Sequence, residues 1–267
     1  MKLGIFDSGL GGLLITKAIQ ERMPDIDLVY YGDTLHLPYG NRSEEVIFNY
    51  TRNAMDYLFQ QDCKLIVLAC NTASAAALRR LQQTWLPKAW PGRNIIGVVV
   101  PTLETAIERG YKKLGVIGTN YMMRSNIFEE ELRKINPDIE IVQTPTPLLV
   151  SLIENDGMPW AESVLQHYLS PMVDKGIECL ILGCTHYPFL RSAITKVTGP
   201  DIELISQDDI IPAKLENYLM RHPEYNNEID RNGRLEFHVS DLTENYAKAA
   251  RTIYGRDIAV EKAKMAA

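Results

Sequence analysis

Short apolar runs rich in β-branched residues alternate along this chain with longer stretches of helical periodicity. A chain with this alternation folds into βα units around mainly parallel sheets, because each apolar strand needs helices to cover both faces. We therefore expect the α/β class. The expected strands are 2–6, 27–31, 65–68, 95–99, 114–117, 139–142, 180–182 and 203–205, and the expected helices are 12–23, 43–61, 73–84, 101–109, 125–135, 161–174, 188–197, 212–221 and 241–254.

A weak internal repeat indicates how these units are arranged. Residues 4–8 resemble residues 115–119, and residues 68–72 resemble residues 182–186 at nearly the same spacing. Two short matches can arise by chance, since βα units resemble one another. However, Cys70 and Cys184 both fall at the carboxyl end of an expected strand, where open α/β sheets bind ligands. We expect two pseudo-symmetric, three-layer α/β lobes whose strand ends face a common cleft.

The expected lobes follow from this repeat. The first comprises residues 1–95, and the second comprises residues 96–206. Residues 207–267 are expected to return to the first lobe, because their long helices need a surface to cover. Residues 223–233 are polar and rich in turn formers, which predicts an exposed loop.

Composition narrows the functional classes. The chain has a net charge of −6 and no run of Lys and Arg, which argues against binding to nucleic acid or to an anionic membrane. No apolar run approaches the roughly 18 residues that a transmembrane helix needs. The first expected strand begins at residue 2, which leaves no room for a signal peptide before it. We therefore expect a cytoplasmic protein whose four cysteines are reduced thiols.

Cys70 and Cys184 are the main candidates for catalytic groups. A single cysteine is usually a small buried apolar side chain, and Cys63 and Cys179 fit that interpretation. Cys70 and Cys184 differ from them because each is followed by small polar residues and then by an expected helix. The positive end of a helix dipole lowers the pKa of a neighbouring thiol, so we expect both to be reactive. A zinc site is unfavourable, because only His186 lies close to either cysteine.

Other candidate groups follow the remaining strands. The glycine-rich segment 7–12 predicts an anion-binding nest of backbone N–H groups, although Asp7 itself can instead cap the following helix. The segment 38–40 can offer backbone donors or form an ordinary turn. His186 is suggestive because it lies two residues after Cys184, whereas Glu154 by composition alone is expected at the surface.

Four motifs together resemble the glutamate racemase family, in its order and at its spacings over almost the whole chain. They are Asp-Ser-Gly-x-Gly-Gly at 7–12, Pro-Tyr-Gly at 38–40, Cys-Asn-Thr-Ala-Ser at 70–74 and Gly-Cys-Thr-His-Tyr-Pro at 183–188. The resemblance implies two α/β lobes related by a pseudo-twofold axis and, commonly, a homodimer. It also implies an enzyme that interconverts L- and D-glutamate with no cofactor and no metal, and that supplies D-glutamate for peptidoglycan.

The same resemblance implies roles for individual residues. Cys70 is the base that acts on D-glutamate, assisted by Asp7, and Cys184 is the base that acts on L-glutamate, assisted by His186. The residues implied to contact or support the substrate are Asp7, Ser8, Tyr39, Gly40, Asn71, Thr72, Thr119, Glu154, Thr185 and His186.

Two segments depart from the family pattern. Residues 120–123 lack the second threonine that often follows the Gly-Thr of the second lobe, so the sequence predicts a substrate contact from Thr119 and leaves the role of residues 120–123 open. Residues 238–242 also differ, and we expect them to lie away from the site.

Other functions stay open at this point. Racemisation needs one group on each face of Cα, which explains two equivalent cysteines. A racemase of a related acidic amino acid such as aspartate would use the same plan. A lyase or hydrolase with a cysteine nucleophile would need only one of the two thiols. A ligand-binding module would use the cleft without turnover and gives no reason for paired cysteines.

Overall fold

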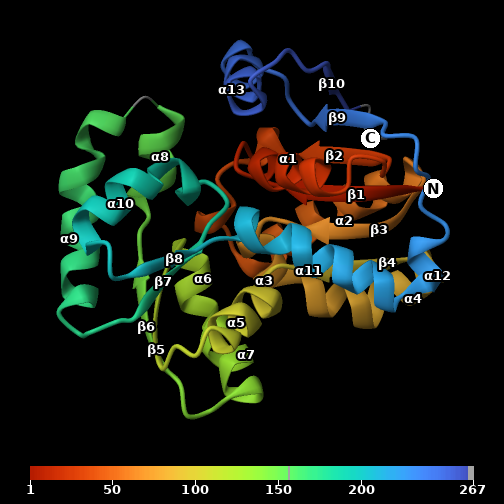
Figure 1. The fold of residues 1–267 in the computed structure, drawn as a ribbon. Coiled ribbons are helices and arrows are strands. Elements are labelled where there is room, and N and C mark those ends of the chain that lie inside the picture. The colour runs from red at the N-terminus through yellow and green to blue at the C-terminus, as the bar shows by residue number, and fades with distance from the viewer. Residues whose placement is uncertain (156, 264–267) are drawn as a thin grey trace.

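The fold, seen in a computed structural model that describes residues 1–155 and 157–263, contains two separate parallel sheets (Figure 1). The first sheet has the strand order β10-β9-β2-β1-β3-β4 and the second has the order β6-β5-β7-β8. Every strand pair is parallel, so the expected α/β class with two lobes and parallel sheets is confirmed. The strands are β1 (Lys2–Asp7), β2 (Leu28–Gly32), β3 (Cys63–Leu68), β4 (Asn94–Gly97), β5 (Lys113–Gly118), β6 (Glu140–Pro145), β7 (Cys179–Gly183), β8 (Glu203–Ile205), β9 (Leu235–Val239) and β10 (Val260–Lys262).

The two sheets repeat one strand order. The order β2-β1-β3-β4 in the first sheet matches β6-β5-β7-β8 in the second, with β1 and β5 at equivalent places. Cys70 therefore follows β3 as Cys184 follows β7, which agrees with the weak repeat in the sequence. Because the carboxyl ends of parallel strands share one edge of a sheet, each lobe presents its functional loops on a single side.

Helices cover both faces of each sheet and make each lobe three-layered. In the first lobe α1 (Gly12–Arg22), α11 (Gln207–Arg221) and α13 (Glu244–Tyr254) pack on one face, and α2 (Glu44–Gln60) and α3 (Asn71–Arg80) on the other. In the second lobe α5 (Val99–Glu108), α6 (Asn120–Ser125) and α7 (Ile127–Ile135) pack opposite α8 (Leu148–Glu154), α9 (Ala161–Val173) and α10 (Arg191–Thr198). Two single-turn helices, α4 (Leu86–Ala89) and α12 (Pro223–Asn226), join longer elements.

The C-terminal segment contributes strands as well as helices, which the sequence pattern did not predict. β9 pairs with β2, and β10 pairs with β9, so they extend the first sheet beyond β2. Leu235–Val239 alternates apolar residues with Glu236 and His238, which is a strand pattern, but the prediction relied on continuous apolar runs and passed over it. The segment expected as a loop at 223–233 contains α12, and the strand expected at 95–99 ends at Gly97 because Val99 begins α5.

The division into lobes at residues 95 and 206 stays a prediction. β4 extends to Gly97, two residues beyond the expected end of the first lobe. α11 begins at Gln207 and packs on both α1 of the first lobe and α5 of the second. This helix, drawn in light blue in Figure 1, therefore links the two lobes.

Candidate active site

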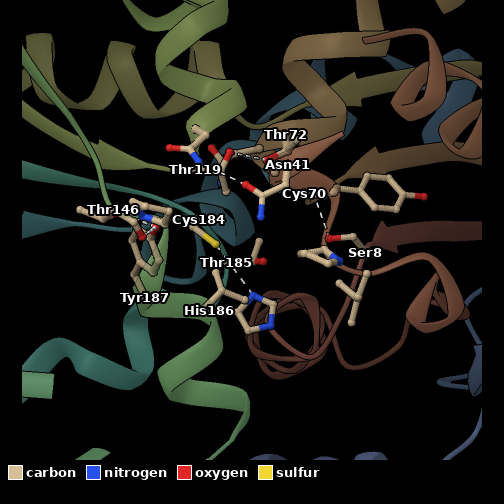
Figure 2. Close-up of a pocket in the computed structure, with 18 of the residues that line it drawn as sticks. Ser8, Asn41, Cys70, Thr72, Thr119, Thr146, Cys184, Thr185, His186 and Tyr187 are labelled. Atoms are coloured by element: carbon tan, nitrogen blue, oxygen red, sulfur yellow. Dashed lines mark hydrogen bonds between the residues drawn. The ribbon is translucent and has the colours of Figure 1, made fainter. Parts of the chain in front are cut away.

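A cavity lies between the two lobes, at the carboxyl ends of both sheets (Figure 2). The loops after β1, β2 and β3 form one wall, and the loops after β5, β6 and β7 form the other. Both candidate cysteines line it. The lining residues are Ser8, Leu37, Pro38, Tyr39, Gly40, Asn41, Cys70, Asn71, Thr72, Thr119, Asn120, Thr146, Pro147, Val150, Ser151, Cys184, Thr185, His186 and Tyr187.

On the second-lobe wall, Cys184 stands next to a histidine–carboxylate pair. The Cys184 Sγ lies 3.9 Å from His186 Nδ1, and His186 Nε2 lies 2.9 Å from Glu154 Oε1. Although burial lowers the pKa of His186, its hydrogen bonds to Cys184 and Glu154 raise it to about 10. The imidazole is therefore protonated at neutral pH. A cation at this place can stabilise negative charge on the Cys184 sulfur.

On the first-lobe wall, Cys70 has no basic side chain as a hydrogen-bond partner among the described residues. Its Sγ lies 3.4 Å from Ser8 Oγ. Burial, together with the neighbouring Asp7 carboxylate, raises the pKa of Cys70 to about 12, against hydrogen bonds from Ser8 and from the Ala73 backbone that lower it. The expectation that the helix dipole gives Cys70 a lowered pKa is therefore wrong for this structure, because the cost of burying a thiolate exceeds the helix effect.

Asp7 occupies the nest that the sequence suggested for a ligand. Its Oδ2 accepts hydrogen bonds from the backbone N–H groups of Gly9 and Gly12, each at 3.0 Å. The hydroxyl of Thr185 donates to Asp7 Oδ1 at 3.1 Å, which ties this carboxylate to the opposite lobe. Burial raises the pKa of Asp7, although the charge of His186 and these hydrogen bonds act against that rise. Asp7 therefore braces the glycine loop behind the cavity and is not part of its lining.

The lobes contact one another directly around the cavity. Thr72 Oγ1 and Thr119 Oγ1 lie 3.0 Å apart, joining the loop after β3 to the loop after β5. A Cβ added to Gly40 would lie 2.5 Å from Thr119 Cβ, and one added to Gly11 would lie 2.3 Å from the backbone carbon of Thr185. Glycine at these two positions is what lets the walls approach this closely.

Most of the residues that the sequence suggested for substrate contact line the cavity. The two exceptions are Asp7 and Glu154, which lie behind it and touch lining residues. Glu154, expected at the surface, is only 23% exposed at its side chain because His186 holds it. Asn71 is 2% exposed, and its side-chain amide has no hydrogen-bond partner among the described residues, so it is free for a ligand.

Sequence reasoning missed several lining residues from the second lobe. Thr146 follows β6, and Pro147, Val150 and Ser151 belong to or precede α8, a helix that the apolar pattern did not predict. Asn120 also lines the cavity, from the loop at 120–123 whose role the sequence left open. The repeat itself was the available signal for Thr146, because this residue follows the strand equivalent to β2.

Residues 238–242, which depart from the family pattern, support the site indirectly. The hydroxyl of Thr34 donates to the carbonyl of Asp241 at 2.5 Å, and the N–H of Leu35 donates to the hydroxyl of Ser240 at 2.9 Å. These bonds fasten the loop that leads from β2 to Pro38 at the cavity. The end of β9 thus holds a site loop in place without lining the cavity itself.

In residues 1–155 and 157–263, no group of three or more His, Cys, Asp or Glu side chains could hold a metal ion. The same part of the chain contains no helix with the length and apolarity needed to cross a membrane.

Comparison with known proteins places these features in a family. Residues 14–208 match the family model of Asp/Glu/hydantoin racemases. The glutamate racemase of Paracoccus denitrificans is 40% identical over 239 residues, which cover 84% of this chain and 87% of that protein.

Solved structures agree with this match. A crystal structure of a glutamate racemase isoform from Bacillus anthracis superimposes with a TM-score of 0.90 at 30% identity, covering 99% of this chain and 97% of that one. The glutamate racemase of Francisella tularensis, solved in complex with D-glutamate, has a TM-score of 0.87 at 31% identity and covers 100% of this chain and 97% of that one. With two facing cysteines in the cleft between two equivalent lobes, the chain belongs to the Asp/Glu/hydantoin racemase family.

Proposed function

We propose that this protein is a glutamate racemase that exchanges the α-proton of its substrate between Cys70 and Cys184. The observation that carries the proposal is the pair of cysteines lining one cavity from equivalent places in two lobes. Inversion at Cα needs a base on one face and an acid on the other, and a repeated lobe supplies both from one chain. The match to glutamate racemases over most of the chain supports glutamate as the substrate.

The reaction proceeds by two proton transfers. With L-glutamate, the Cys184 thiolate removes the α-proton, so that the Cα–H bond breaks and an S–H bond forms. The Cys70 thiol then gives its proton to the opposite face of Cα and is left as a thiolate. D-glutamate reacts in the reverse sense. Each turnover therefore exchanges the protonation states of the two cysteines, and no other group is consumed.

The surroundings of each cysteine suit this exchange. Hydrogen bonds to Cys184 and to Glu154 raise the pKa of His186, and the resulting cation can stabilise negative charge on the Cys184 sulfur when Cys184 acts as the base. Burial raises the pKa of Cys70, which suits this thiol to give a proton while Cys184 acts as the base. The α-proton of an amino acid is weakly acidic, so the developing carbanion needs donors aimed at its carboxylate in a site that excludes water. The unpartnered Asn71 amide and the Thr72–Thr119 hydroxyl pair supply such donors from the cavity walls.

Single-cysteine variants test the proposal. Cys70→Ser and Cys184→Ser should each lower the rate of glutamate racemisation, followed by circular dichroism, by about 10²- to 10⁴-fold or more, the usual effect of losing an acid–base group. Cys63→Ala removes a buried thiol outside the cavity and serves as the matched control. A Cys184→Ser variant that racemises glutamate at the control rate would contradict the two-base assignment.

A substrate with a leaving group on Cβ assigns the faces. Elimination needs only one proton removed, so each variant should still eliminate from one enantiomer. Cys70→Ser should act on the L-enantiomer alone, and Cys184→Ser on the D-enantiomer alone. The reversed preference would overturn the face assignment while leaving two bases in place.

The proposal also covers the cellular location, the oligomeric state and the biological role of the enzyme. We infer a cytoplasmic homodimer that supplies D-glutamate for peptidoglycan, on the resemblance to the glutamate racemase family. Light scattering of the purified protein should give twice the mass of 30.2 kDa that the sequence specifies. A mass equal to that of one chain at all concentrations would contradict the dimer.

A further inference from the structure

Two tyrosines in the cavity lining are each held by the residue that follows the second strand of their lobe. In the first lobe Asp33 follows β2, and the Tyr39 hydroxyl donates to Asp33 Oδ2 at 2.5 Å. In the second lobe Thr146 follows β6, and its Oγ1 lies 2.7 Å from the Tyr187 hydroxyl. Both tyrosines are at most 1% exposed.

The backbone shows that these two anchors occupy equivalent places. The Asp33 N–H donates to the Asp7 carbonyl at 3.0 Å, and the Thr146 N–H donates to the Gly118 carbonyl at 2.9 Å. Asp7 and Gly118 are the last residues of the equivalent strands β1 and β5. The repeated fold has therefore placed a tyrosine anchor at the same position in both walls, with different chemistry in each.

The first anchor is built around a buried carboxylate. Asp33 is 3% exposed, and it also accepts a contact from His36 Nδ1 at 2.8 Å. Burial and the Asp33 charge raise the pKa of Tyr39 well above its ordinary value, so the Tyr39 hydroxyl keeps its proton and donates it to this hydrogen bond. Tyr39 therefore offers the cavity its ring and backbone, because its O–H is committed to Asp33.

The segment after Tyr39 bridges the lobes. Gly40 lies against Thr119, as its missing Cβ would meet the Thr119 side chain at 2.5 Å. Asn120 Nδ2 donates to Asn41 Oδ1 at 3.2 Å. A displacement of Tyr39 would therefore move the contact that sets how far apart the two walls stand.

The second anchor acts on the catalytic turn. Tyr187 directly follows His186, and the Tyr187 hydroxyl also donates to the Thr146 carbonyl at 3.3 Å. Thr146 Oγ1 in turn lies 3.2 Å from the Gly118 carbonyl, at the end of β5. The turn that carries Cys184 and His186 is thereby fastened to the centre of the second sheet.

We propose that Asp33 and Thr146 are positioning residues that act through Tyr39 and Tyr187 to hold the two cavity walls at the separation where both thiols reach Cα. This inference rests on the proposed function. Neither residue takes or gives a proton in the reaction. Their effect is on geometry, and racemisation is sensitive to it because the same Cα must lie within reach of a thiol on each side.

Two reactions with different geometric demands test the proposal. Racemisation needs both thiols in register, whereas elimination from a glutamate with chlorine on Cβ needs one. In that elimination the thiolate takes the α-proton, the electron pair expels chloride from Cβ, and water converts the resulting enamine, through its imine, to a 2-oxo acid and ammonia. Asp33→Asn and Thr146→Val should lower kcat for glutamate racemisation by about tenfold or more, because the first replaces the charged acceptor of the Tyr39 hydroxyl by a neutral amide and the second removes the hydroxyl that contacts Tyr187. Both variants should keep most of their elimination rate and a nearly unchanged KM.

The matched control removes a similar hydrogen bond elsewhere. Tyr57 is 7% exposed in the same lobe as Tyr39, and its hydroxyl lies 2.9 Å from His238 Nδ1, away from the cavity. Tyr57→Phe should leave both rates unchanged. A double variant of Asp33→Asn with Tyr39→Phe should be no slower in racemisation than the slower of its two single variants, if Asp33 acts through Tyr39.

Equal losses of racemisation and elimination in Asp33→Asn would overturn the proposal, since they would mean general damage. Unchanged racemisation would overturn it as well. Thiol labelling gives a readout that does not depend on the reaction: loosened walls should make Cys70 and Cys184 react faster in Asp33→Asn than in the wild type or Tyr57→Phe. A wild-type chain that fails to racemise glutamate would contradict the proposed function instead, and unchanged labelling of Asp33→Asn would then count against the positioning role.

Discussion

Cys70 and Cys184 occupy equivalent positions, yet their immediate neighbours differ in charge. Cys184 has the protonated His186 beside it, with Glu154 behind, whereas the hydrogen-bond donors to Cys70 within the described part of the chain are the Ser8 hydroxyl and the Ala73 backbone N–H. The repeat therefore supplies two cysteines in one geometry, and different neighbouring residues supply a difference in local charge. The cation beside Cys184 suits it to act as the base on L-glutamate, and the raised pKa of Cys70 suits its thiol to give the proton.

Thiol labelling should reveal that difference. A substoichiometric thiol reagent should modify Cys184 before Cys70, because His186 stabilises the reactive thiolate of Cys184 and burial raises the pKa of Cys70 to about 12. Labelling of Cys70 should rise steadily from neutral to alkaline pH. Bound glutamate should protect both thiols. Peptide mapping by mass spectrometry gives the order, and modification of Cys63 or Cys179 first would contradict it, since both are fully buried.

The pKa of His186 also predicts how stability varies with pH. Its pKa is raised in the folded state from 6.5 to about 10, so its contribution is fully present below pH 6.5 and is lost as the pH rises toward and through about 10. Glu154→Gln weakens the partner that holds the proton. The variant should lose about 1.5–3 kcal/mol of unfolding free energy at neutral pH, the usual size of a hydrogen bond to a charged group.

Urea unfolding at several pH values measures this effect. The free energy of unfolding should fall less between pH 6.5 and about 10 in Glu154→Gln than in the wild type. Glu162→Gln removes an exposed carboxylate paired with Lys196 and is the control. The same fall in Glu154→Gln and in the wild type would show that Glu154 does not hold the His186 proton.

At the scale of elements, the site depends on strand ends and on the loops that follow them. The ends of β1, β3, β5 and β7 carry Asp7, Cys70, Thr119 and Cys184 at or just beyond them, and local sequence was enough to predict these four strands. β9 was missed because the prediction looked for continuous apolar runs, whereas Leu235–Val239 alternates apolar and polar residues and pairs with the distant β2. β10 was missed because it is short and carries two exposed charged residues, and it is a strand only through its pairing with β9. Glu154 was placed at the surface because nothing local shows that α8 brings it to His186.

The pKa of Cys70 could not be predicted for a similar reason. The helix that follows it is visible in the sequence, but the burial of the thiol and the nearby Asp7 carboxylate come from the packing of two lobes. The pKa of Cys70 thus depends on contacts between segments that are distant in the sequence, whereas the end of the preceding strand can be predicted from local periodicity.

The glycine loop after β1 should tolerate substitution unequally. A Cβ at Gly11 would lie 2.3 Å from the Thr185 backbone, which cannot move without shifting the catalytic turn. The atoms nearest to a Cβ at Gly9 would belong to the His186 and Leu37 side chains, at 3.1 Å and beyond. Gly11→Ala should lose about 1–3 kcal/mol or more of unfolding free energy and most racemase activity, and Gly9→Ala should lose less of both. Equal behaviour of the two variants, compared by thermal unfolding and circular dichroism assay, would contradict this account of the lobe contact.

At the scale of the whole molecule, the cavity joins two lobes that each have their own core. Direct bonds such as Thr72 to Thr119 and Thr185 to Asp7 cross between them, and α11 packs on both. A ligand bound between the walls adds further links across the same boundary. Substrate binding should therefore stabilise the molecule as a unit and not one lobe alone.

Thermal unfolding with added ligand tests this coupling and the choice of substrate. D-glutamate at about one hundred times its Kd should raise the unfolding free energy by about 2.7 kcal/mol and shift the whole transition upward. Aspartate at the same concentration should give little or no shift. A larger shift with aspartate would favour the related racemase of that amino acid, and a shift confined to one of two separate transitions would contradict binding between the lobes.

Solvent isotope incorporation tests the two-base claim most directly. The wild-type enzyme is given L-glutamate in deuterium oxide, and substrate and product are separated early in the reaction for mass spectrometry. The product D-glutamate should carry deuterium at Cα, because the Cys70 thiol that delivers the hydrogen has exchanged with solvent. The remaining L-glutamate should keep its original hydrogen, because Cys184 can return only the proton it has just taken. Early deuterium in the remaining L-glutamate, or retained hydrogen in the product, would mean that one group serves both faces and would contradict the account.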